Sequence, residues 1–262
     1  MDIEITYFIK HFSTVSKVLV SNGYLWSSGN KTEVIDLVDS NVKCKDLDDF
    51  PLEIKFAVSA NLASLPIICG GLIYNESSYD NTIYSSDKCF KYMDGGWQHF
   101  ATMLEKRMGA AGIIYDNAFH IFGGCDLDEL DTNLRGCDPL DESTSLQSSE
   151  IVNVDGSSTK GPQLPRRFSS HAIATINSTV SIITGGFQDS DSMSDQTWYF
   201  NHETQEFQPG PDLLEGRNNH NSGTITDQET KEKIVIVAGG MSELTELLLN
   251  GEWVAGKNPT EL

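Results

Sequence analysis

One recurring pattern constrains the fold of this chain more than any other feature: a short apolar run that ends in two glycines. Residues 111–124 read AGIIYDNAFHIFGG, which is two apolar runs joined by Asp116-Asn117. An Asp-Asn pair between two such runs is favourable turn chemistry for an antiparallel hairpin. The glycine pair adopts backbone angles that other residues avoid, so the chain can bend sharply where the second run ends.

The pattern occurs five times. Four copies end at Gly70-Gly71, Gly123-Gly124, Gly185-Gly186 and Gly239-Gly240, and a degenerate copy ends at Asn22-Gly23. Successive copies are 48, 53, 62 and 54 residues apart. Each copy precedes a polar loop and another short apolar run, such as 150–154 or 197–200. Three units then carry an aromatic residue that marks a fourth strand, at Trp97, Phe207 and Trp253. A period near fifty residues with about four strands per unit indicates an array of repeated small sheets.

These units resemble the kelch-repeat family, in which each repeat forms one four-stranded blade of a β-propeller. The resemblance covers nearly the whole chain. The WD-type propeller is less similar, because no Trp-Asp pair closes any unit. The resemblance implies an all-β, kelch-type β-propeller of about five four-stranded blades, either a closed five-bladed ring or a truncated six-bladed one. It predicts a single domain over 1–262, with blades at roughly 1–50, 51–103, 104–163, 164–213 and 214–262.

The chain is strongly acidic, with 38 acidic and 18 basic residues and a formal net charge of −20. Such a surface repels phosphate backbones, so nucleic acid and anionic membranes are poor partners. No run approaches eighteen apolar residues, and residues 1–15 lack the pattern of a signal peptide, so we expect no membrane span and a cytoplasmic location. Acidic residues crowd 126–142 and 189–195. Their spacing does not match a calcium loop, which favours solvated acidic loops.

The five cysteines leave two interpretations open. Two pairs could form, Cys69 with Cys89 and Cys125 with Cys137, and Cys44 would then be left over. An odd cysteine argues weakly against a secreted disulfide framework, so free thiols in a reducing compartment are the expectation. The alternative is an extracellular, glycosylated domain, for which the sequence offers three acceptor motifs, beginning at Asn30, Asn75 and Asn177.

Catalytic patterns are missing from the sequence. It contains no Gly-x-Ser-x-Gly elbow, no phosphate-binding glycine loop, and no Cys-x-x-Cys or histidine spacing typical of a metal site. We therefore predict no enzyme activity, no cofactor and no metal, and expect a module that presents propeller loops to a protein or an acidic peptide. The resemblance implies a part in a ubiquitin-ligase adaptor or an actin-associated protein. It also implies two alternatives, since kelch-like propellers include copper radical oxidases and a sugar mutarotase.

Basic residues cluster at one position of the repeat. Four of the five arginines precede the first strand of a unit, and a lysine takes this place in the second unit; the residues are Lys55, Arg107, Arg166, Arg167 and Arg217. In a propeller these connecting segments gather on one face, where guanidinium groups could bind carboxylates in a bidentate manner. One hypothesis is that Arg107, Arg167 and Arg217 contact an acidic peptide. The alternative is that the basic residue belongs to the repeat and packs between blades.

Overall fold

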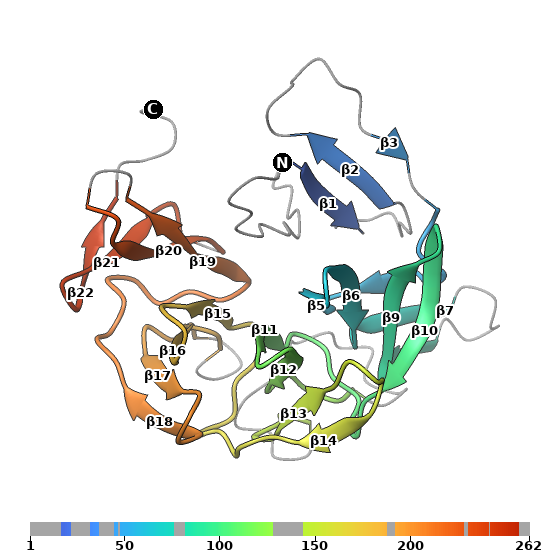
Figure 1. The fold of residues 1–262 in the computed structure, drawn as a ribbon. Coiled ribbons are helices and arrows are strands. Elements are labelled where there is room, and N and C mark those ends of the chain that lie inside the picture. The colour runs from blue at the N-terminus through green and yellow to red at the C-terminus, as the bar shows by residue number, and fades with distance from the viewer. Residues whose placement is uncertain are drawn as a thin grey trace.

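The computed structural model describes residues 17–21, 32–36, 45–46, 48–75, 82–127, 144–187, 192–227, 230–240 and 242–256. This part of the chain is all-β, and its sheets follow one another around a common centre (Figure 1). The prediction of a β-propeller is therefore confirmed. Among the described residues, none forms a helix with the length and hydropathy that crossing a bilayer requires.

Four blades are four-stranded antiparallel sheets in which each strand pairs with the next one of its blade. The second blade contains β5 (Val58–Leu62), β6 (Leu65–Cys69), β9 (Lys88–Met93) and β10 (Gly96–Thr102). The third contains β11 (Ala111–Tyr115), β12 (Ala118–Phe122), β13 (Ser149–Val152) and β14 (Ser158–Lys160). The fourth contains β15 (Ala172–Thr175), β16 (Val180–Thr184), β17 (Thr197–Asn201) and β18 (Glu206–Pro209). The fifth contains β19 (His220–Thr226), β20 (Lys233–Gly239), β21 (Glu246–Leu249) and β22 (Glu252–Ala255).

The first blade is described as three strands, β1 (Lys17–Ser21), β2 (Thr32–Asp36) and β3 (Lys45–Asp46). β1 pairs with β2, and β2 with β3, all antiparallel. The repeat glycine predicted here, Gly23, lies outside the described residues. Most of the acidic stretches at 126–142 and 189–195 also lie outside them.

Within the described part of the chain, an additional three-stranded sheet accompanies the second blade. β7 (Leu72–Asn75) and β8 (Thr82–Ser85) form a hairpin directly after Gly71, and β4 (Ile54–Lys55) pairs with β7. The sequence predicted a polar loop at this point, and that prediction is wrong. The Ile-Tyr pairs in both segments favour strands, because β-branched and aromatic side chains pack well on a pleated surface.

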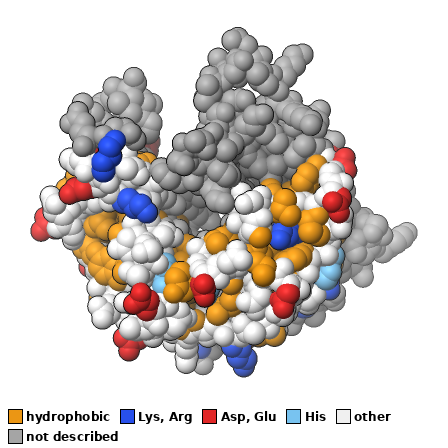
Figure 2. Space-filling view, viewed as in Figure 1, with side chains coloured by type: hydrophobic (Ala, Val, Ile, Leu, Met, Phe, Trp, Pro, Cys, Tyr) orange, Lys and Arg blue, Asp and Glu red, His pale blue; other side chains and the backbone are white. Residues whose placement is uncertain are grey.

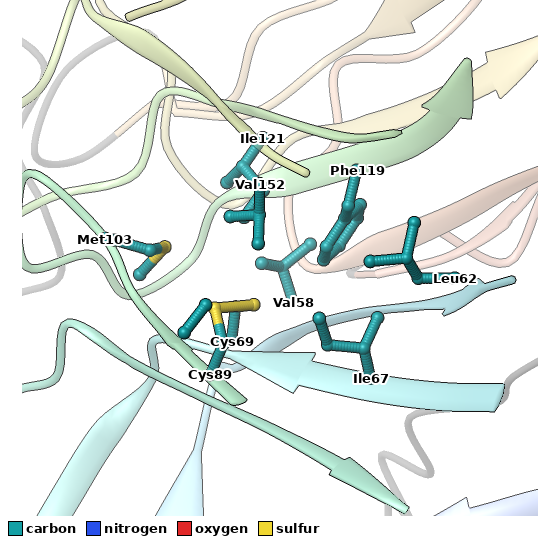
Figure 3. Packing of buried hydrophobic residues seen from close by; sticks show 10 residues of the cluster. Val58, Leu62, Ile67, Cys69, Cys89, Met103, Phe119, Ile121 and Val152 are labelled. Atoms are coloured by element: carbon teal, nitrogen blue, oxygen red, sulfur yellow. A yellow bond between two sulfur atoms is a disulfide. The ribbon is translucent and has the colours of Figure 1, made fainter. Parts of the chain in front are cut away.

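The core lies between the blades, where the faces of neighbouring sheets meet. Between the second and third blades it includes Ile67, Phe119, Ile121 and Val152, all with no exposed surface (Figure 3). The inner strands β5, β11, β15 and β19 lie next to one another in that order. Packing sheet against sheet in this way gives each blade a buried face that it could not bury alone.

A buried disulfide joins Cys69 and Cys89, which are directly paired residues of β6 and β9 in the second blade (Figure 3). Both side chains have no exposed surface. Cys125 is also disulfide-bonded. The expectation of free thiols is therefore wrong for these three cysteines. The sequence had left this pair open as one of two that could form, and the structure shows it.

Three of the glycine doublets are hydrogen-bonded to the segment that leads to the next blade. Gly123 and Gly124 have φ of +59° and +89°, and the Gly124 N–H donates to the Phe168 carbonyl, 2.7 Å away in the segment that leads to the fourth blade. A Cβ on Gly123 would lie 2.4 Å from that oxygen. Such close approach and positive φ exclude other residues. The doublets ending at Gly71, Gly186 and Gly240 have positive φ at both positions as well.

Candidate functional site

The arginine of the third blade is a structural group and not a surface contact. Arg107 is 1% exposed, and its Nε lies 2.5 Å from Glu150 Oε1 on β13. Its guanidinium also donates to the Gly123 carbonyl at 2.8 Å and to the Ser148 carbonyl at 3.2 Å. Arg107 thus ties the segment before β11 to the glycine doublet and third strand of its own blade.

The fifth blade repeats this arrangement. Arg217 has no exposed surface, and its Nη2 lies 2.5 Å from Glu246 Oε1 on β21. Nη1 donates to the Leu244 carbonyl at 2.9 Å. In both blades the second carboxylate oxygen accepts from a backbone N–H of the connecting segment, from Leu104 at 2.6 Å and from Leu214 at 2.7 Å. Each buried charge is therefore paired and hydrogen-bonded, as burial of an ion requires.

These positions correct the hypothesis of an arginine surface for a partner. Arg107 and Arg217 are enclosed, because each meets a buried glutamate of its own blade, and neither can contact a peptide. Arg166 is half-buried, with its guanidinium carbon 4.4 Å from the centre of the Phe168 ring and Nη2 donating to Ser194 Oγ at 2.9 Å. Arg167 and Lys55 are half-buried and have interactions of their own. The five basic residues do not form an exposed patch.

The fourth blade carries apolar side chains where its neighbours carry the ion pair. Gly71, Gly124 and Gly186 donate to the carbonyls of Arg107, Phe168 and Arg217 respectively, so these three residues are equivalent. Across the strands, the residues opposite Ile121, Ile183 and Val237 are Glu150, Trp198 and Glu246. Phe168 and Trp198 lie in one apolar cluster. Both members of the pair are replaced together, which leaves no buried charge unpaired.

Two buried histidines occupy equivalent positions at the start of β15 and β19. A Cβ on Gly123 would lie 3.2 Å from His171 Cε1, and one on Gly185 would lie 2.7 Å from His220 Cε1, so each ring packs on a glycine of the preceding blade. Burial, above all, lowers the pKa of both His171 and His220 to about 3. Both rings are therefore neutral at pH 7 and serve as packing groups. The third blade has Ala110 at this position.

The second blade carries a groove of about 790 Å³. It lies where the additional sheet meets β9 and β10. Most of the surface area of its lining is apolar, and a few charged groups lie at it. The lining residues are Leu52, Ile73, Tyr84, Ser85, Ser86, Asp87, Lys88, Phe90, His99 and Lys106. The volume is in the range of a site for a small molecule or for a short peptide segment.

The floor of this groove is held by an aromatic cluster. Phe50 is completely buried and meets the rings of Phe90 and Trp97 edge to face, with centroid distances of 5.2 and 5.0 Å. Phe90 also meets the His99 ring at 5.9 Å. Aromatic pairs in this geometry fix ring orientation beyond the effect of burial alone. The groove is therefore largely pre-formed.

The lining of the groove carries a net positive charge, whereas the whole chain carries a net charge of −20. Its formally charged side chains at pH 7 are Lys88, Lys106 and Asp87, so the lining carries one more positive than negative charge. Lys88 and Asp87 are 3.8 Å apart and solvent-exposed, so their mutual attraction is weak. Figure 2 shows apolar side chains in patches over the described blades, with few Lys or Arg side chains among them. The groove is thus a basic, apolar site on an acidic protein.

Comparison with known proteins supports the fold alone. No protein-family model matches the sequence, and no curated protein does. Among solved structures, the structure of YjhT is similar with a TM-score of 0.80 and 14% sequence identity, over 98% of this chain and 84% of YjhT. Identity this low carries no information about function.

Sequence reasoning missed the groove because its residues come from five separate segments. The only local signal was the pair of Ile-Tyr segments after Gly71, which favours an extra hairpin at this point of the repeat. Nothing in the local pattern indicates that Lys106, before the third blade, would line the same groove as Phe90.

Proposed function

We propose that this chain is a kelch-type propeller that acts as a non-catalytic binding module, and that the groove on the second blade takes an acidic peptide segment with an apolar side chain. The observation that carries the proposal is that aromatic side chains and two lysines line the same groove. The proposal moves the expected peptide contact from the arginines before the blades to Lys88 and Lys106.

The two lysines of the groove favour a peptide segment that carries negative charge. An anionic segment is repelled by most of a surface with net charge −20, but in the groove it meets two ammonium groups. Lys88 is 48% exposed in its side chain and can therefore reach a bound carboxylate. The apolar lining from Leu52, Ile73 and Phe90 would accept an aliphatic or aromatic side chain. Rigid aromatic support lowers the entropy cost of binding.

Selection from a random displayed peptide library tests the proposal. We expect the selected peptides to combine Asp or Glu with an apolar residue, and their binding, measured by fluorescence anisotropy, to weaken as salt is raised. The variant K88E/K106E should lower the affinity at least tenfold. The matched control is Lys160→Glu, an exposed lysine on β14 outside the groove, which should leave the affinity unchanged. Selected peptides without acidic residues, or unchanged affinity in K88E/K106E, would overturn the proposal.

A further inference from the structure

The oxidation state of the cysteines indicates where this chain folds. All three cysteines in the described part, Cys69, Cys89 and Cys125, are in disulfides. When a disulfide forms, a pair of thiols loses two protons and two electrons. A thiol–disulfide oxidant, such as the secretory compartment supplies, must accept them. The Cys69–Cys89 bond lies in the core between the second and third blades.

One glycosylation motif, Asn177-Ser178-Thr179, lies in the exposed turn between β15 and β16. The Asn177 Oδ1 accepts three hydrogen bonds, from the Thr179 N–H at 2.9 Å, the Thr179 hydroxyl at 3.0 Å and the Val180 N–H at 2.9 Å. These bonds hold the carbonyl side of the amide against the turn. The Nδ2 of Asn177 makes no hydrogen bond within the described part of the chain and is left to solvent.

We propose that this protein, in place of the cytoplasmic location expected from the sequence, folds in an oxidising secretory compartment and carries an N-linked glycan on Asn177. In the transfer, Nδ2 loses a proton and forms a bond to the anomeric carbon of a lipid-diphosphate-linked oligosaccharide, and the lipid diphosphate leaves. The hydroxyl of the Thr at the third position of the motif assists recognition of the amide. In the folded state the same Thr179 hydroxyl keeps Oδ1 turned inward, so a glycan on Nδ2 projects into solvent without disturbing the blade.

Strand order places this glycan away from the groove. β15 runs from the segment after Arg167 to the Asn177 turn, and β16 runs back to Gly185. The Asn177 turn is therefore at the end of its blade opposite the glycine doublet. The groove lies at the doublet end of the second blade, since the Ser86 N–H donates to the Gly71 carbonyl at 2.8 Å. A glycan on Asn177 thus leaves peptide binding unobstructed.

The chain contains its own negative control. Asn201, at the end of β17, uses Oδ1 in the same manner, accepting from the Glu203 N–H at 2.9 Å and the Thr204 N–H at 3.1 Å. Residue 203 is a glutamate, so Asn201 lacks the hydroxyl of the motif. The two asparagines differ in the motif and share the turn geometry.

The test is to secrete the full chain from cultured animal cells behind a cleavable leader and to map glycans by mass spectrometry. Release with peptide-N-glycosidase in ¹⁸O-water labels each formerly glycosylated asparagine as ¹⁸O-aspartate. Non-reduced peptides from the same sample must show Cys69 linked to Cys89. We expect label at Asn177 and none at Asn201, and we expect Thr179→Ala to abolish it while Thr179→Ser retains it.

Two results would overturn the proposal. The first is unlabelled Asn177 in secreted protein whose Cys69–Cys89 bond has formed. The second is five titratable thiols in protein purified without a reductant, since the chain contains five cysteines. Thr179→Ala and Thr179→Ser both keep Asn177, so equal secretion of the two variants shows that a lost glycan does not result from a folding failure.

Discussion

The buried ion pair of the third blade gives a quantitative test of how the blades are held together. In Arg107→Phe, the Glu150 carboxylate stays 1% exposed and loses its guanidinium partner. Among the hydrogen bonds described above, it keeps only the one from the Leu104 N–H at 2.6 Å. Leaving one member of a buried pair uncompensated costs about 3–5 kcal/mol. We expect the free energy of unfolding to fall by that amount.

The double variant Arg107→Phe/Glu150→Trp copies the residues that the fourth blade uses at these positions, Phe168 and Trp198. Because no charge remains buried, most of the loss should be recovered, to within about 1–2 kcal/mol of the wild type. The two substitutions should therefore couple by at least about 2 kcal/mol. Such coupling would explain why the fourth blade has replaced both the arginine and the glutamate, and not one of them alone.

Urea unfolding followed by far-ultraviolet circular dichroism measures these differences, and the slope with urea checks that the same surface is exposed in each variant. Glu105→Gln is the matched control. Glu105 lies 2.7 Å from Arg107 but is 46% exposed, so its loss should cost less than about 1 kcal/mol. Additive effects of the two core substitutions, or a cost of Arg107→Phe no larger than that of Glu105→Gln, would refute the reasoning.

Three further predictions follow from the fold. Cys69→Ala/Cys89→Ala opens a loop with a sequence separation of 20 and should lower the free energy of unfolding by about 3 kcal/mol in urea titrations. The pKa of His171 is about 3 in the fold and about 6.5 when unfolded, so the unfolded state binds more protons in acid. Stability should fall by about 2 kcal/mol per such histidine from pH 6.5 to pH 5, and His171→Ala should reduce this slope in urea titrations at several pH values. Gly123→Ala should cost at least about 2 kcal/mol by thermal unfolding, whereas Gly223→Ala, with open space around a Cβ and no positive φ, should change stability by less than about 1 kcal/mol.

Local signals were sufficient to predict the blades. The apolar runs before Gly71, Gly124, Gly186 and Gly240 became the second strands, and the doublets took the positive φ that glycine permits. Both features depend on a few consecutive residues, because alternation and backbone freedom are properties of the local chain. The additional hairpin after Gly71 was missed, although its Ile-Tyr pairs favour strands.

The candidate site could not be predicted in the same way. The sequence left two interpretations of Arg107 and Arg217 open, contact with an acidic peptide or packing between blades, and the structure shows both side chains buried. Their burial depends on Glu150 and Glu246, which are 43 and 29 residues away along the chain. The groove likewise combines Phe90 with residues from four other segments.

The sequence by itself determined the repeat, the blade strands and the bends at the glycine doublets, because each is encoded within a few neighbouring residues. The tertiary structure decided which basic residues are enclosed, which cysteines are paired, and that Lys88 and Lys106 meet at one aromatic groove. The physical reason is that charge burial and disulfide pairing depend on partners brought together by strand pairing between distant segments. At this position of the repeat, a buried arginine accompanies a glutamate on the third strand of its blade, and Phe168 accompanies Trp198.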